Sequence, residues 1–161
     1  MNIWARIRQL KVGQLLQLSL FLLSEPLLIR STLRASKRTM AICDTLFGST
    51  HHRSNKANAF RHALWNILIC QKTLKTTKNL EKSIIWTQKV TSLYEKVTDN
   101  SNIEKEMDLH NNAFGLNLFS SIIDKNETEI IEILQKSMKN SQKSGKLEDF
   151  VLFKNSLVHI E

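Results

Sequence analysis

Polar side chains of the kinds that do chemistry concentrate in two short segments of this chain, residues 57–66 and 106–115. The set comprises amides, a guanidinium, an imidazole and a carboxylate: Asn58, Arg61, His62, Asn66, Asp108, Asn111 and Asn112. An imidazole oriented by a carboxylate can act as a general base on water, and guanidinium and amide groups can stabilise charge on a phosphoryl or acyl group. The same imidazole and carboxylate, with a further carboxylate, can instead hold a divalent metal ion that activates water. Residue spacing leaves both mechanisms open.

Helical winding at about 100° per residue predicts where these groups point. In the helix expected over residues 55–73, apolar residues occupy nearly the whole circumference, and Asn58 and Asn66 lie about 40° to either side of His62. In the helix expected over 101–124, Asp108 lies on the same side as several large apolar residues, and His110 lies opposite. Both helices therefore carry a polar stripe that faces the core.

A buried carboxylate without partners would cost several kcal/mol, so Asp108 must meet polar groups of the other central helix, such as His62. The contact would be either a structural hydrogen-bond network or an active site. The density of expensive polar groups in two short segments favours the active site.

The whole chain has the composition of an ordinary globular protein, with 161 residues, 42% hydrophobic and 24% charged. Four Gly and one Pro are too few for a strand-rich fold with many tight turns. We therefore predict an all-α, compact single-domain bundle of about six to seven helices, with two central helices that carry the buried polar stripes. Residues 1–26 would form an N-terminal apolar and basic helix that either lies in a membrane interface or packs on the core. Residues 27–161 would form a helical domain with its motif core at 55–119.

Apolar periodicity and turn residues predict the remaining helices of the domain over 27–47, 79–96, 127–140 and 147–160. The first of these should turn Leu28, Leu33 and Leu46 inward. Ser101 followed by Glu104 fits a capping box and predicts the start of the second central helix.

The N-terminal segment and the charge distribution bear on location and partners. The apolar run of residues 12–23 is shorter than the roughly 20 residues that span a bilayer, and no convincing cleavage site follows it. Residues 1–89 carry 15 basic and 3 acidic side chains, whereas residues 90–161 carry 8 and 12. The two halves would either pack together and neutralise each other or leave a basic face that can meet phosphate groups. We expect a cytoplasmic protein or one peripheral on the inner membrane. An anionic lipid or other phosphate-containing substrate is the expected partner; nucleic acid is not expected, and the sequence does not define the oligomeric state.

Covalent catalysis is not expected, because the residues offer no convincing nucleophile. Cys70 lies eight residues from His62, about 12 Å along the helix. Cys43 and Cys70 should be reduced, buried and inert. His51 and His52 are expected in an exposed loop, where they could add metal ligands or bind substrate phosphate but more often have no special role, and His159 is expected near a terminus.

The two segments read A-N-A-F-R-H-A-L-W-N and E-M-D-L-H-N-N-A-F-G. They resemble the signatures of a bacterial family of unknown function, and similar domains lie at the C-terminal ends of some polymorphic toxins. The resemblance implies a compact all-α fold and a hydrolytic activity. A His-Glu pair precedes the second motif in this family; the chain has Tyr94-Glu95 there, so only Glu95 carries over.

The function expected is a hydrolase with a buried His/Asp/Asn site between two helices, acting on a phosphate-containing or lipid-linked substrate near a membrane. The alternative is a non-enzymatic helical binding protein whose buried network is structural. The candidate catalytic residues are His62, Asp108, Arg61, Asn66, Asn111, Asn112 and Glu95. The candidate substrate-binding residues are Asn58, Trp65, His110 and Arg38. A divalent metal, if present, would be held by His62, Asp108 and Glu95.

Overall fold

The computed structural model describes residue 13 and residues 25–97 and 101–161. These residues form, in chain order, α3 (Pro26–Phe47), the 3₁₀ turn η1 (Gly48–His52), α4 (Lys56–Thr77), α5 (Leu80–Val97), α6 (Asn102–Phe119), α7 (Glu127–Lys139), β1 (Gln142–Lys143), α8 (Leu147–Leu152) and β2 (Val158–His159). The expected all-α fold is confirmed. The N-terminal helix predicted before Pro26 lies outside the described residues. Within the described ranges, no helix is long and apolar enough to cross a membrane.

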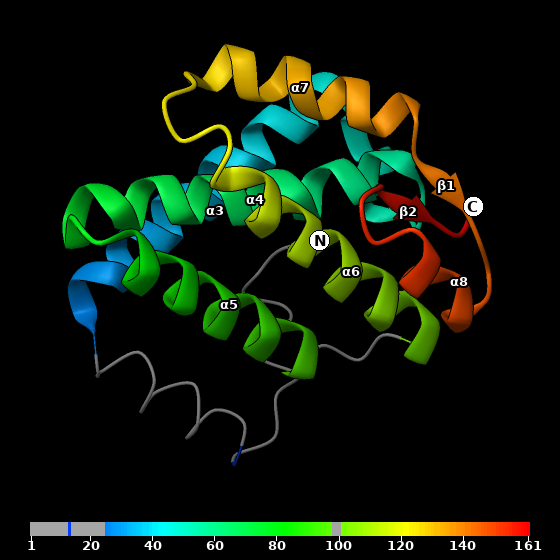
Figure 1. Cartoon of the computed structure of the whole chain (residues 1–161), viewed down its shortest axis with the longest axis horizontal. Helices are drawn as coiled ribbons and strands as arrows, with labels where there is room; N and C mark the ends of the chain where they lie inside the picture. Colours follow the sequence, from blue (N-terminus) through cyan, green and yellow to red (C-terminus); the bar gives the residue numbers. More distant parts are fainter. Residues whose placement is uncertain (1–12, 14–24, 98–100) are drawn as a thin grey trace.

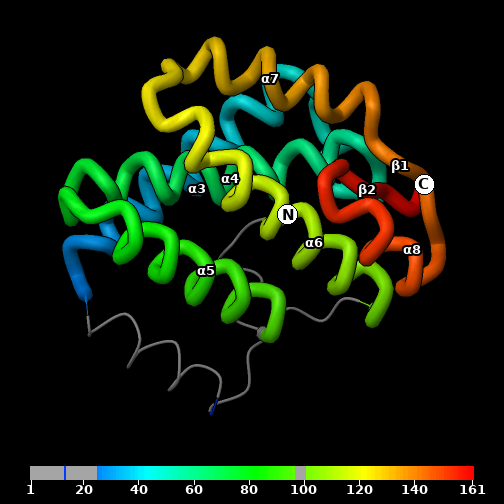
Figure 2. Tube along the Cα trace, viewed as in Figure 1, coloured from blue at the N-terminus to red at the C-terminus, as the bar shows by residue number. Residues whose placement is uncertain are grey.

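Helix α4 is the centre of the molecule. It packs against α3, α5, α6 and α7, and in Figure 1 α5 and α6 lie side by side in front of it while α7 runs along the opposite edge. Figure 2 shows the same path of the chain, with α8 and the two short strands gathered at one end. Helix α4 buries residues on almost every side, including Phe60, Leu64 and Ile67. This confirms that its apolar circumference marks a helix enclosed by others.

A glycine allows α4 and α6 to approach closely. A Cβ placed on Gly115 would lie 2.8 Å from Cα of Ala63 and closer still to the Ala63 carbonyl oxygen. Since carbon atoms pack at about 3.5–4.0 Å, only glycine fits this position without displacing a helix. Gly115 lies three residues after Asn112, and Ala63 directly follows His62. The close contact therefore sets the distance between the two polar stripes.

Side-chain caps begin the two central helices. Asn55 accepts hydrogen bonds from the backbone N–H groups of Ala57 and Asn58, and Ser101 and Glu104 form the predicted capping box. The predicted extension of α6 to residue 124 is wrong, because α6 ends at Phe119. Beyond that residue, backbone N–H groups bond three residues back, from Ser121 to Leu118 and from Ile122 to Phe119, so the chain tightens into turns.

The C-terminal segment departs most from prediction. The helix expected over 147–160 ends at Leu152, and Val158 and His159 form a short strand parallel to β1. The side chain of Asn111 on α6 accepts from the backbone N–H of Val158 and donates to its carbonyl oxygen, both at 2.9 Å. An amide side chain thus acts as a strand partner for β2. A helix through these residues would forfeit both bonds.

The inward face of α3 also differs from expectation. Leu28 is buried as predicted, but Leu33 is 58% and Leu46 39% exposed. The buried face of α3 consists mostly of small residues instead: Thr32, Ala35, Thr39 and Cys43. Small side chains let two helices pack closely, which a weighting by hydrophobicity alone does not detect.

Candidate functional site

Three ionisable side chains from three different helices meet beside α4. His62 of α4 lies between Glu95 of α5 and Asp108 of α6. Its Nδ1 is 3.5 Å from Oε1 of Glu95, and its Nε2 is 3.2 Å from Oδ1 of Asp108. All three are buried, with 2%, 0% and 4% of their surface exposed. The predicted meeting of His62 and Asp108 is therefore present, and Glu95 completes it.

A chain of amides fixes the orientation of the imidazole. Asn66 donates from Nδ2 to Oδ1 of Asn112 at 2.7 Å, and Asn112 donates from its own Nδ2 to Oε1 of Glu95 at 3.3 Å. Asn66 also donates from Nδ2 to the backbone carbonyl of His62 at 3.0 Å, which fixes the orientation of its amide, and Oγ1 of Thr91 on α5 lies 3.2 Å from Oδ1 of Asn66. Oδ1 of Asn112 therefore faces Nδ1 of His62, 3.1 Å away. Because an amide oxygen only accepts, Nδ1 must carry the proton.

Arg61 independently defines the other nitrogen. Its Nη2 lies 2.8 Å from Nε2 of His62, and its Nη1 donates to the backbone carbonyl of His51 at 2.7 Å. A guanidinium has only donors, so Nε2 must accept. Both arguments assign His62 as the neutral Nδ1–H tautomer, with the lone pair of Nε2 directed toward Arg61 and Asp108.

Nε2 of His62 and Oδ1 of Asp108 approach each other closely. They lie 3.2 Å apart, and with the lone pair of Nε2 facing a carboxylate oxygen, a positive group between them would be favourable. The guanidinium of Arg61, a proton or a metal ion can fill that role. One ligand atom from each of His62, Glu95 and Asp108 lies within 4.8 Å of the others, a spacing at which one ion could be held.

Two predicted substrate-binding residues lie on α4 near this centre. Asn58 is buried one turn before His62, and its Oδ1 has no hydrogen-bond partner among the described residues. Trp65 donates from its indole N–H to Oγ of Ser36 on α3 at 2.7 Å, and its ring packs edge-on against Tyr94. Tyr94 stands where the resembled family has histidine, and its ring here supports Trp65.

Three other candidate residues lie apart from the centre. Asn111 holds β2, as described above. His110 contacts the carbonyl oxygen of Ser156 at 2.9 Å and packs against Phe150. Arg38 lies exposed on α3 and pairs through two nitrogens with the carboxylate of Glu127 on α7. All three side chains therefore make these contacts outside the His62 centre.

Neither cysteine is a suitable nucleophile. Cys43 and Cys70 are buried free thiols. Burial raises the pKa of Cys43 to about 12 and that of Cys70 to about 11, so both remain protonated at neutral pH. Neither thiol is therefore available as a nucleophile in the folded protein.

A second group of ionisable side chains lies where α3 ends; the sequence pointed to its two histidines but not to the partner Asp44. The prediction that His51 is exposed is wrong, because it is fully buried in η1, where its Nε2 lies 2.9 Å from Oδ1 of Asp44. His52 is exposed, and its ring lies 4.1 Å from that of His51 between centroids. Burial, and then the neighbouring His51, lower the pKa of His52 to about 4. Thr91 was likewise missed, since an isolated threonine in a helix carries no signal.

Residues 19–142 match the family described as Domain of unknown function (DUF6973). The chain belongs to this family. No curated protein and no solved structure matches it. The part matched to DUF6973 includes His62, Glu95, Asp108, Arg61 and the amides that orient them, so the whole polar centre lies within the domain. It ends before α8 and β2, and the contact of Asn111 with Val158 therefore joins the domain to the segment that follows it.

Proposed function

We propose that this DUF6973 domain is a hydrolase in which Nε2 of His62 activates a water molecule next to Asp108. The observation that carries the proposal is the enforced tautomer of His62. Glu95 and Asn112 hold Nδ1–H from one side, and the lone pair of Nε2 lies beside a carboxylate and a guanidinium on the other. An imidazole held by a carboxylate at one nitrogen and basic at the other is the arrangement of a general base. Glu95, rather than Asp108, would orient the ring.

A phosphoester is the substrate class that fits this centre. Nε2 of His62 takes a proton from water while the water oxygen attacks phosphorus, the bond to the leaving oxygen breaks, and the proton passes from His62 to that oxygen. Arg61 would turn from Nε2 to the phosphoryl oxygens and stabilise their charge. The resemblance of the two motifs to domains of polymorphic toxins supports a hydrolytic activity.

A substrate on a membrane lipid is the finer form of the proposal. Arg30, Arg34 and Lys37 are exposed on α3, the helix that packs against α4 and reaches Trp65 through Ser36. Three cations on one helix would attract an anionic lipid surface, each contributing about 1 kcal/mol. Arg38 contributes less, because Glu127 neutralises it.

The same centre could work with a divalent metal ion held by His62, Glu95 and Asp108. The close grouping of their ligand atoms supports this form. An ion would supply Lewis-acid activation of water, and the residues of this chain would hold it and orient its ligands. Elemental analysis of tag-free protein distinguishes the two forms, because a resident ion would be stoichiometric in wild type and lost from a folded Asp108→Asn variant.

The competing function is a binding protein whose polar network only fixes the register of α4, α5 and α6. The almost complete burial of His62, Glu95 and Asp108 favours it, because a substrate must reach a reacting group.

Hydrolysis of 4-nitrophenyl phosphate and of bis(4-nitrophenyl) phosphate by wild type, His62→Gln, Asp108→Asn and the exposed control Asn117→Ala tests the proposal. We expect loss of about 10²–10⁴-fold in the two site variants, both still folded by circular dichroism, and no loss in the control. A wild type inactive on both compounds, with site variants that lose only stability, would establish the structural network instead.

A further inference from the structure

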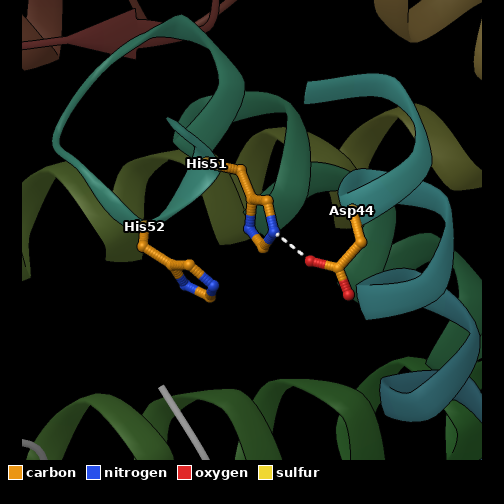
Figure 3. Close-up of side chains that lie close together, drawn as sticks. All are labelled: Asp44, His51 and His52. Carbon is orange, nitrogen blue, oxygen red and sulfur yellow. Dashed lines mark hydrogen bonds and ion pairs between the residues drawn. The ribbon is translucent and has the colours of Figure 1, made fainter. Parts of the chain in front are cut away.

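A cluster separate from the His62 centre lies at the junction of α3 and η1. Asp44 belongs to the last turn of α3, and His51 and His52 end η1. Gly48 connects the two elements with φ of 56°, a left-handed conformation that folds the 3₁₀ turn back onto the helix. Figure 3 shows the result, with the imidazole of His51 between the carboxylate of Asp44 and the ring of His52. Residues seven and eight positions apart in sequence are thereby brought together.

His51 has an unusual hydrogen-bonding state for a fully buried imidazole. Its Nε2 donates to Oδ1 of Asp44 at 2.9 Å, because a carboxylate oxygen only accepts. Nδ1 then carries a lone pair, and this atom is buried without a hydrogen-bond partner in the described part of the chain. In Figure 3 it lies on the edge of the ring that faces His52. A buried acceptor with no donor is costly, and a bound cation would satisfy it.

The three side chains have the spacing and chemistry of a metal site. One ligand atom from each lies within 4.8 Å of the others. A carboxylate that accepts from the second nitrogen of a ligand histidine is the usual support of such a ring. Two imidazoles favour Zn²⁺, Ni²⁺ or Cu²⁺ over Mg²⁺ and Ca²⁺, which prefer oxygen ligands. Asp44 and His52 are exposed, so an ion could enter from solvent while buried His51 holds the geometry.

We propose that Asp44, His51 and His52 form a binding site for a divalent transition-metal ion such as Zn²⁺, with Nδ1 of His51 and one nitrogen of His52 as ligands and with Asp44 as the hydrogen-bond partner of His51 and the negative charge beside the ion. Nδ1 of His52 lies 3.4 Å from Nη1 of Arg61, so Nε2 is assigned as the ligand atom of this ring. The positive charge of Arg61 lowers the affinity, and the carboxylate of Asp44 offsets it.

The site has a structural link to the His62 centre. The carbonyl oxygen of His51 accepts from Nη1 of Arg61, and Nη2 of the same guanidinium lies against Nε2 of His62. An ion that holds η1 in place would therefore also hold the carbonyl that positions Arg61. The metal site and the hydrolase proposal remain separable, because they use different ligands.

Zn²⁺ binding to tag-free protein, measured by competition with a chromogenic chelator, tests the site, with Co²⁺ absorption as a second readout of ligand geometry. His52→Gln and Asp44→Asn change exposed side chains and should leave the fold intact. Each should weaken one Zn²⁺ site by about tenfold or more, at least the effect of losing an outer partner of a metal ligand. The matched control Asp124→Asn, an exposed carboxylate on the turn after α6, should bind as wild type does.

Asp108→Asn separates this site from the buried centre and should leave it intact. The proposal is overturned if wild type binds no Zn²⁺, if all of its binding disappears in Asp108→Asn, or if His52→Gln and Asp44→Asn bind as tightly as wild type. Each of these outcomes leaves the test of phosphoester hydrolysis unaffected.

Discussion

Replacement of Gly115 by alanine should separate the two central helices and disconnect the polar centre. The added Cβ would lie 2.8 Å from Cα of Ala63, and normal contact needs about 3.5–4.0 Å, so α4 and α6 must move apart by about 1 Å. The hydrogen bonds from Nδ1 of His62 and Nδ2 of Asn66 to Asn112, at 3.1 and 2.7 Å, would then stretch beyond effective length.

The net cost follows from three contributions. Alanine gains about 1 kcal/mol over glycine within a helix. Overpacking costs about 1–3 kcal/mol, and the upper end applies because the opposing atoms are backbone and cannot rotate away. Buried amides that lose partners add about 1–3 kcal/mol. We expect Gly115→Ala to lower the free energy of unfolding by about 2 kcal/mol or more, and the melting temperature by about 4–8 °C.

Urea unfolding followed by far-ultraviolet circular dichroism measures this change. The matched control is Gly145→Ala, where an added Cβ meets nothing within 4 Å, and this variant should be as stable as wild type or slightly more so. If Gly115→Ala matched or exceeded the stability of wild type, the close approach of α4 and α6 would be refuted, and with it the geometry of the centre.

Three further predictions concern other parts of the fold. Asn111→Ala leaves the N–H and carbonyl of Val158 without their side-chain partners. We expect the free energy of unfolding to fall by about 2 kcal/mol and proteolysis after residue 152 to become faster, whereas the control Asn117→Ala should behave as wild type. Equal rates of proteolysis in the two variants would contradict this prediction. Burial, and then the charges of Lys56 and Lys143, lower the pKa of His159, so the unfolded chain binds the proton more readily than the folded protein. The free energy of unfolding should therefore fall as the pH drops through about 6.5, and it should fall less steeply in His159→Gln. The same dependence of stability on pH in both proteins would exclude His159 as the cause. Burial raises the pKa values of Cys43 and Cys70 to about 12 and 11, so both thiols should resist modification by iodoacetamide at pH 8 until urea unfolds the protein. Rapid modification of the native protein would contradict their burial.

Helical periodicity predicted the centre because its residues lie on regular helices. The angular positions of His62 and Asp108 on two largely apolar helices required them to meet, and the capping box at Ser101 set where α6 begins. Glu95 depended on the resemblance, since a single glutamate on α5 has no distinctive spacing. Its contact with His62 is a tertiary one.

Tertiary contacts that override local pattern account for the missed features. The C-terminal helix gave way to a strand because Asn111, 47 residues earlier, bonds the backbone of Val158. His51 is buried because Gly48 turns η1 back onto α3, which no periodicity records. Leu33 is exposed because the buried face of α3 is lined by small residues such as Ala35 and Thr39. In each case the deciding partner is distant in sequence or depends on one backbone angle.

The proposed hydrolase requires that His62 be neutral, with its proton on Nδ1. Long-range ¹H–¹⁵N correlation spectra of uniformly labelled protein show which ring nitrogen carries a proton, and the signals absent from His62→Gln assign the residue. We predict a proton on Nδ1 and none on Nε2, the form that can accept a proton from water or bind a metal ion. A proton on both nitrogens would contradict it, because His62 would then be a cation between two carboxylates and the network would be a structural ion pair.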